Sequence, residues 1–117
     1  MTIAAHIAKA RHQLVRRLRA TLDSHGFVEV MTPVVQAAEP TMRAALPSWA
    51  GKPCELRTCM ELRLRSALAE LDAVYEIGPC FRPEPPDKDH HPEFHMLELF
   101  WRKPDFGLLC ELTRDLL

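Results

Sequence analysis

The stretch that decides the fold is AVYEIGPCFRPEPPDKDHHPEFHMLELFW, residues 73–101. Residues 73–81 carry β-branched and aromatic side chains, which favour a strand. Residues 93–101 alternate with period two, which is typical of a second strand with two distinct faces. One face receives Phe94, Met96, Glu98 and Phe100, and the other receives His95, Leu97, Leu99 and Trp101. The charged, proline-rich residues between the strands predict a long-looped antiparallel hairpin.

On the N-terminal side, apolar residues recur at spacings of three and four: Ile3, Ile7, Ala10, Leu14, Leu18 and Leu22. This spacing predicts one face of an amphipathic helix, which Gly26 is suited to end. FVEV, residues 27–30, favours a short strand that ends at Pro33. Residues 36–53 contain prolines and show no period, so we expect a long irregular loop there.

Two further helices are expected around the hairpin. Residues 59–71 place one apolar set on a single helical face: Met60, Leu64, Ala67, Leu68 and Leu71. Asp105 can N-cap a final helix whose apolar residues are Leu108, Leu109, Leu112 and Leu116. The order helix, strand, loop, helix, hairpin, helix predicts an α+β fold with an antiparallel sheet flanked by helices.

The composition excludes several classes of protein. The chain has 117 residues, of which 47% are hydrophobic and 26% charged, as in one small globular domain. A net charge of −1 argues against a polycation built for nucleic acid, although residues 1–22 carry Lys and Arg and no acid. Two interpretations of that basic helix stay open: an RNA contact, or the solvated side of an amphipathic helix.

The cysteines and the hydropathy limit the cellular compartments in which we expect the protein. The four cysteines are not spaced as C-x-x-C, which argues against a zinc ribbon or a thioredoxin-like motif. No stretch approaches the roughly 18 consecutive apolar residues of a membrane span, and no secretory leader is visible. We therefore expect reduced thiols, a cytoplasmic location and no membrane association.

The hairpin carries a set of groups that could hold an amino acid and a nucleotide. Arg82 and Glu84 lie two apart, so an extended backbone points them to the same side. An arginine fork binds carboxylate or phosphate, a nearby carboxylate such as Glu98 accepts from an amine, and an exposed Phe94 could stack on a base. The alternative is an Arg–Glu pair on a solvated hairpin, with Phe94 in the core.

A metal site is the second interpretation of this stretch. His91 and His95 are spaced i, i+4, but Pro92 stands where a zincin has its glutamate. In a strand these histidines would lie about 13 Å apart, which disfavours a shared metal ion. His90 and His91 could instead contact phosphate or ribose as polar loop residues. No P-loop or dinucleotide-binding glycine motif is present.

Three stretches together resemble the class II aminoacyl-tRNA synthetases. GFVEVMTPVV, residues 26–35, is similar to motif 1, and residues 74–101 are similar to motif 2 of the lysyl type, with its F-R-N-E and R-H-N-P-E-F-T-M-x-E patterns. LRTCMELRLR, residues 56–65, resembles the helix that precedes motif 2. The resemblance implies a partial class II fold in one partial catalytic domain, residues 1–117, with motif 1 at about 14–35 and motif 2 at about 74–101.

The resemblance also implies residue roles. Arg82 corresponds to the catalytic arginine that bridges the amino-acid carboxylate and the α-phosphate of ATP. Around it, the implied ATP-binding residues are Glu84, His90, His91 and Phe94. The implied amino-acid-binding residues, besides Arg82, are Glu61, Glu98 and Phe100. Pro33 would lie at a dimer interface, as motif 1 does in the family.

Some positions depart from the family pattern. Asp89 stands where a basic residue is common, His91 where asparagine is usual, and Phe100 where a tyrosine usually contacts lysine. Cys59-Met60 stands where a small residue and proline are usual. Motif 3, which supplies a second ATP-site arginine and the acids that bind Mg²⁺, is not found in this chain, so no metal ligand is predicted here.

The activity implied is activation of lysine by ATP to lysyl-adenylate, followed by transfer to tRNA or to a lysine of elongation factor P. ATP and Mg²⁺ are the implied cofactors, and a homodimer is the implied assembly. The lack of an anticodon-binding domain points to the short paralogue that modifies elongation factor P. The alternatives are a non-catalytic fragment acting as a dimerisation or regulatory module, and a metal-binding protein using His90, His91 and His95.

Overall fold

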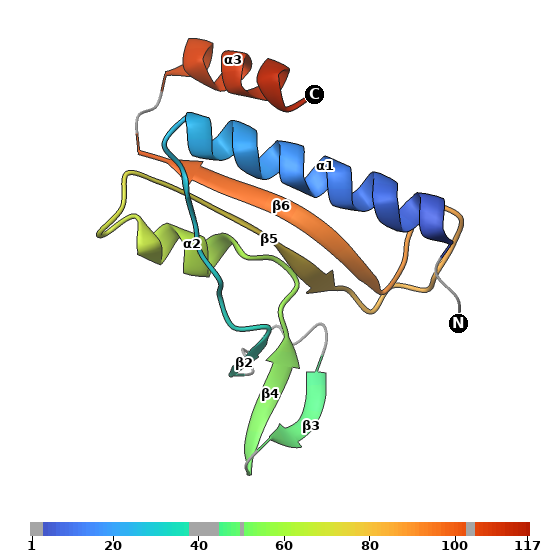
Figure 1. Cartoon of the computed structure of the whole chain (residues 1–117). Helices are drawn as coiled ribbons and strands as arrows, with labels where there is room; N and C mark the ends of the chain where they lie inside the picture. The colour runs from blue at the N-terminus through green and yellow to red at the C-terminus, as the bar shows by residue number, and fades with distance from the viewer. Residues whose placement is uncertain (1–3, 38–44, 50, 103–104) are drawn as a thin grey trace.

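The computed structural model describes residues 4–37, 45–49, 51–102 and 105–117. The described elements follow in chain order (Figure 1): α1 (Ala5–Ser24), β1 (Val28–Glu29), β2 (Val35–Ala37), β3 (Ala45–Trp49), β4 (Lys52–Leu56), α2 (Glu61–Ala67), β5 (Ala73–Phe81), β6 (Glu93–Trp101) and α3 (Phe106–Leu116). The predicted α+β class is confirmed.

The main sheet is built on the predicted hairpin. β5 and β6 pair antiparallel from Ala73↔Trp101 to Phe81↔Glu93, without a break in register. β1 joins the other edge of β5, but it runs parallel, with Val28 opposite Val74. The expectation of a wholly antiparallel sheet is therefore wrong for this strand. The chain between β1 and β5 passes through the second sheet and α2, and a crossover of that length permits a parallel pair.

A small second sheet occupies part of the segment that was expected to be an irregular loop. Its strands are antiparallel in the order β2-β4-β3. The register between β3 and β4 shifts between Leu46 and Trp49, so the prolines of these strands coincide with an interruption of the ladder. Gly51, at φ 76°, makes the turn between the two strands. Residues 38–44 and 50 of the expected loop lie outside the described residues.

The two faces of the hairpin pack against different helices (Figure 1). On the α1 and α3 side, Leu97, Leu99 and Trp101 pack with a core that contains Leu22, Phe27, Tyr75 and Leu112. On the α2 side, Phe94, Met96 and Phe100 pack with a core of Met60, Leu64, Val74 and Cys80. The predicted assignment of the β6 side chains to two faces is therefore confirmed.

The helix ends follow the sequence signals with small differences. Gly26 adopts φ 80° and ends α1, and Asp105 accepts hydrogen bonds from the backbone N–H groups of Gly107 and Leu108. α2 is shorter than residues 59–71, but its predicted apolar face does pack into one core. No helix in the described part of the chain is long and apolar enough to cross a membrane.

The apolar face expected along α1 is buried only near its C-terminal end. Leu22 is fully buried, whereas Ile7 and Leu14 are 57% and 56% exposed. The C-terminal turns of α1 lie on the main core and beside α3. The N-terminal half extends past this core over the other end of the hairpin (Figure 1), which leaves room beneath it.

Candidate functional site

The hairpin loop forms a cavity at the end of β5. Its volume is about 370 Å³, and the residues that line it are Arg82, Glu84, Asp89, His90, His91 and Phe94. The backbone N–H of Arg82 donates to the carbonyl of Pro92 at 2.8 Å, which extends the hairpin pairing by one step. The guanidinium carbon of Arg82 then lies 5.1 Å from the centre of the Phe94 ring. This cation–π contact fixes a planar cation beside an aromatic surface.

The loop itself is organised by Asp87. Its carboxylate accepts from the backbone N–H groups of Asp89 and His90 at 2.7 Å each, and lies 2.9 Å from His90 Nδ1. The Asp89 N–H, followed by the His90 ring, holds the pKa of Asp87 below its ordinary value. The Nδ1 side of His90 is thus engaged within the loop, which leaves Nε2 as its free ring nitrogen. Asp87 is a residue that the sequence reasoning missed, although aspartate beginning a turn is a known signal.

The sequence-predicted ATP-binding residues are brought together by this loop. Arg82, Glu84, His90, His91 and Phe94 all line the one cavity. Asp89, which departs from the family pattern, lines the same cavity. The predicted amino-acid residues Glu61, Glu98 and Phe100 do not line this cavity; they lie further along the same side of the sheet, around the start of α2.

Glu98 is the carboxylate on that side of β6. It is half-buried, and its Oε2 accepts a hydrogen bond of 2.9 Å from the backbone N–H of Met60 at the start of α2. Among the described residues, no Lys, Arg or His forms an ion pair with Glu98. Glu61 follows Met60 but is exposed, with Oε1 3.8 Å from Arg65 Nη1. Phe100 packs against the core beneath α2.

A buried ion pair supports both parts of the site. Arg57 is 2% exposed and Glu76 is 4% exposed, and Arg57 Nη1 donates to Glu76 Oε1. Arg57 Nε donates to the Pro79 carbonyl at 2.7 Å, and Nη1 also donates to the Thr32 carbonyl at 3.2 Å. Glu76 Oε2 accepts from the backbone N–H and the hydroxyl of Thr32 at 3.1 and 2.7 Å. Both charges are therefore paired and hydrogen-bonded, as buried charges must be.

The backbone of Arg57 extends this support to the hairpin. Its carbonyl accepts from the N–H of Phe81 at 2.9 Å, one residue before Arg82, and its N–H donates to the Val34 carbonyl. The segment after β1, the end of β4 and the end of β5 are thus tied together at one residue. Sequence reasoning missed Arg57 and Glu76 because a buried charge pair between distant strands leaves no local spacing pattern.

Gly78 is a residue whose lack of a side chain is explained by this ion pair. A Cβ at Gly78 would overlap Nη2 of Arg57. The middle of β5 therefore needs a residue without a side chain, because the guanidinium lies directly on the strand.

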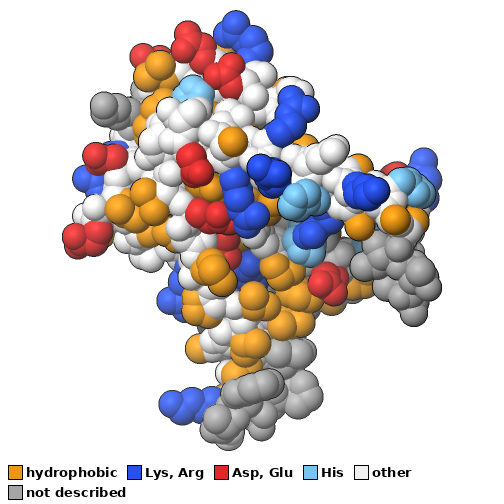
Figure 2. All heavy atoms as spheres, in the orientation of Figure 1, with side chains coloured by type: hydrophobic (Ala, Val, Ile, Leu, Met, Phe, Trp, Pro, Cys, Tyr) orange, Lys and Arg blue, Asp and Glu red, His pale blue; other side chains and the backbone are white. Residues whose placement is uncertain are grey.

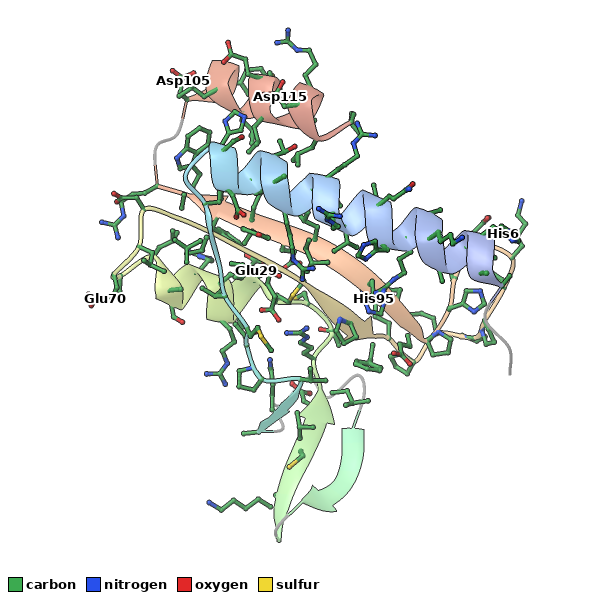
Figure 3. The ribbon with its side chains drawn as sticks, in the orientation of Figure 1. His6, Glu29, Glu70, His95, Asp105 and Asp115 are labelled. Carbon is green, nitrogen blue, oxygen red and sulfur yellow. The ribbon has the colours of Figure 1, made fainter. Side chains whose placement is uncertain are left out.

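A second ion pair, which is exposed, joins α1 to β1. Arg19 of α1 binds Glu29 of β1 through Nε and Nη2, with distances of 2.8 to 3.1 Å. The Arg19 hydrogen bonds hold the pKa of Glu29 below its ordinary value. Figure 3 labels Glu29 over the strands of the main sheet, below α1 in that view. Pro33 lies beyond β1 and is exposed, and its carbonyl accepts from the Gln36 side chain.

Metal ligands are not assembled in the described residues. No group of three or more His, Cys, Asp or Glu there could hold a metal ion. His90 and His91 line the hairpin cavity, whereas His95 lines a different cavity beneath α1. The described residues therefore do not fit the Mg²⁺ that the family resemblance implies.

Comparison with known proteins agrees with the geometry. Residues 2–117 match the family described as tRNA synthetases class II (D, K and N). The chain belongs to this family. The α1–β1 unit and the β5–β6 hairpin are thus parts of a class II synthetase catalytic fold.

Curated relatives narrow the resemblance to the lysine type. The chain is 38% identical over 115 residues to a lysine–tRNA ligase of Saccharolobus solfataricus, covering 92% of this chain and 23% of the relative. It is 37% identical over 114 residues to that of Deinococcus radiodurans, with 93% and 22% covered. It is 34% identical over 117 residues to the lysine–tRNA ligase of Bacillus subtilis, covering 95% of this chain and 23% of the relative. The chain therefore spans less than a quarter of these relatives and is a lysyl-type class II catalytic fragment.

Proposed function

We propose that this chain provides the lysine and ATP contacts of a lysine-activating enzyme, with residues 1–117 as a partial catalytic domain. The observation that carries the proposal is Glu98. It is a half-buried carboxylate that one backbone N–H holds in place and that no cation pairs with in the described part of the chain. A substrate ammonium group would supply the missing partner, since a buried anion is stable when it is paired.

The ATP side of the proposal rests on the hairpin cavity. Phe94 offers a ring face for adenine, with Glu84 on the same side, and His90 and His91 stand near the phosphates. Arg82 lies beside the ring, between the cavity and the strand. Its fork can bind the lysine carboxylate and the α-phosphate together, which offsets the repulsion between two anions.

The reaction proposed is an in-line displacement. A carboxylate oxygen of lysine attacks the α-phosphorus of ATP, the bond to the pyrophosphate oxygen breaks, and lysyl-adenylate and pyrophosphate form. Arg82 supplies charge stabilisation and orientation, and no covalent bond to the protein is made. Glu98, and Glu61 if it turns inward, would bind the lysine side chain, with Phe100 packed behind them.

The acceptor of the lysyl group is tRNA or a lysine of elongation factor P. We propose a homodimer that pairs through the motif 1 surface at Pro33. The ion pair between Arg19 and Glu29 holds α1 to β1, the strand that precedes Pro33.

The test is lysine-dependent exchange of pyrophosphate into ATP. We expect exchange in the purified chain, loss of at least about a hundredfold in Arg82→Ala, and no change in Arg102→Ala. Arg102 is the matched control because it lies at the opposite end of the hairpin, exposed beside Asp72. Glu98→Gln is expected to weaken lysine binding while ATP binding persists.

A second candidate function is a non-catalytic synthetase-like module. The observation that favours it is Asp89, an acid that lines the hairpin cavity and would repel a phosphate. Binding of lysine and ATP in calorimetry without any exchange would support this candidate. Absence of both exchange and binding would contradict the proposal, and stoichiometric zinc in elemental analysis would favour the histidine-based metal protein instead.

A further inference from the structure

A second cavity lies on the opposite face of the hairpin, beneath the N-terminal half of α1. Its volume is about 460 Å³. One wall is the helix, and the other is formed by Ile77, Gly78 and Pro79 of β5 with His95 of β6. Figure 3 labels His95 below α1, among side chains that descend from that helix. The cavity is separate from the proposed lysine and ATP site, whose residues line the other side.

The polar residues that line this cavity are all cations or histidines: Arg11, His12, Arg16, Arg19 and His95. No Asp or Glu lines it among the described residues. Arg19 is paired with Glu29, but Arg11 and Arg16 have no ion-pair partner in the described part of the chain. Figure 2 shows Lys, Arg and His side chains gathered side by side over this half of α1.

This arrangement has an electrostatic cost in the absence of a ligand. Arg11, Arg16 and Arg19 follow one another at spacings of five and three along one helix, and no acid of α1 precedes Asp23. Like charges three apart on a helix, as Arg16 and Arg19 are, repel each other. An anion in the cavity would remove that repulsion and would bind two guanidinium forks that are now unpaired.

The rest of the lining selects the kind of anion. Ile7, Val15, Ile77 and Pro79 give the cavity apolar walls. A free inorganic ion would leave these walls in water, whereas an organic body would cover them. The volume is within the range of about 300–1,000 Å³ that is usual for small-molecule sites.

We propose that this cavity binds a phosphorylated small molecule with an apolar or aromatic body, the chemical class to which nucleoside diphosphates belong. The phosphates would contact Arg11 and Arg16, with the N–H groups of His12 and His95 as further donors. The body would lie against Ile77 and Pro79. This site goes beyond the proposed function, because it needs none of the residues that would handle lysine or ATP.

The experiment is a titration of the ¹⁵N-labelled chain, followed by NMR, in the Arg82→Ala background that disables the hairpin site. ADP is the probe. Pyrophosphate tests the phosphate groups without an organic body, and adenosine tests the organic body without phosphates. We expect ADP to shift the amide signals of residues 11–16 and 77–78, and to bind more tightly than either part. Arg11→Gln with Arg16→Gln should weaken ADP by at least about tenfold, since two charge-assisted contacts are lost.

Arg17→Gln is the matched control, because Arg17 lies on α1 but does not line this cavity. It should leave the affinity for ADP unchanged. The proposal is wrong if ADP shifts only the loop at residues 82–94, if the double substitution binds ADP as well as its parent, or if pyrophosphate binds as tightly as ADP. Because Arg82 is already removed, loss of pyrophosphate exchange and loss of this binding are separate outcomes.

Discussion

The two faces of the β5–β6 hairpin are held in different ways. On the α2 side, the charged residues Arg57 and Glu76 are buried and hydrogen-bonded to Thr32 and Pro79. On the α1 and α3 side, the core is apolar, with Leu22, Phe27 and Leu112 around the strand residues. Apolar contacts tolerate small shifts, whereas hydrogen bonds to a guanidinium fix both distance and direction. The proposed chemistry lies on the α2 side, where hydrogen bonds fix both the position and the direction of the backbone.

The substitution expected to weaken the α2 side most is Arg57→Met. Removing the cation leaves Glu76 buried without its charge partner, which typically costs about 3–5 kcal/mol of unfolding free energy. Chemical denaturation of the variant measures this loss. The apolar side should unfold with the rest of the chain in one transition.

A matched double variant separates charge from packing. Arg57→Met with Glu76→Leu removes both charges, and replacing a buried pair by apolar residues is often close to neutral. We therefore expect the double variant to be more stable than Arg57→Met alone. An equal or larger loss in the double variant would show that the hydrogen bonds to Thr32 and Pro79 matter more than the unpaired charge.

Leu112→Ala tests the apolar side. Leu112 is fully buried between α3 and the main core, so truncation should cost about 2–5 kcal/mol of unfolding free energy. Leu109→Ala on the same helix is the control, because Leu109 is 44% exposed and should cost under about 1 kcal/mol. Similar losses in the two variants would mean that α3 does not dock through Leu112.

Tyr75 gives the apolar side a pH limit. Burial, and then the charges of Glu29 and Asp23, raises the pKa of Tyr75 to about 12. An unfolded tyrosine ionises near pH 10, so stability is intact below about pH 10 and falls by about 1.4 kcal/mol per pH unit up to about pH 12. Denaturation across this range should show the fall in the parent chain, and a smaller fall in Tyr75→Phe. Parallel curves would contradict the assignment to Tyr75.

The smallest expected effect is at the cap of α3. Asp105→Ala removes the acceptor for the N–H groups of Gly107 and Leu108, with an expected loss of about 1 kcal/mol. Asp105→Asn should retain most of the stability, because asparagine caps as well as aspartate. A thermal melt of the two variants beside the parent decides this, and equal melting temperatures for all three would count against the cap.

Much of the main sheet could be predicted from local sequence. The alternation in β6 assigned Phe94 and Trp101 to opposite faces, and Gly26 and Asp105 marked helix ends, because these signals act within a few residues. The second sheet could not be found in this way. Its strands are short, two of them contain a proline, and their pairing depends on partners that come later in the chain.

The site was predictable to a similar degree. The five residues assigned to ATP line one cavity because motif 2 is a contiguous hairpin, although their roles stay predictions. Asp87 was missed although its turn signal was present. Arg57 could not be found, because its partners Thr32, Glu76 and Pro79 are 19 to 25 residues away.

The contact of Gly78 with the guanidinium of Arg57 also has a genetic consequence. Since any Cβ at position 78 would meet Nη2, Gly78→Ala should act as a loss-of-function allele. A smaller residue at position 57 would make space for that methyl group but would leave Glu76 buried without its cation, so suppressors of Gly78→Ala should need changes at positions 57 and 76 together. Positions 57, 76 and 78 would then have to change as one functional unit.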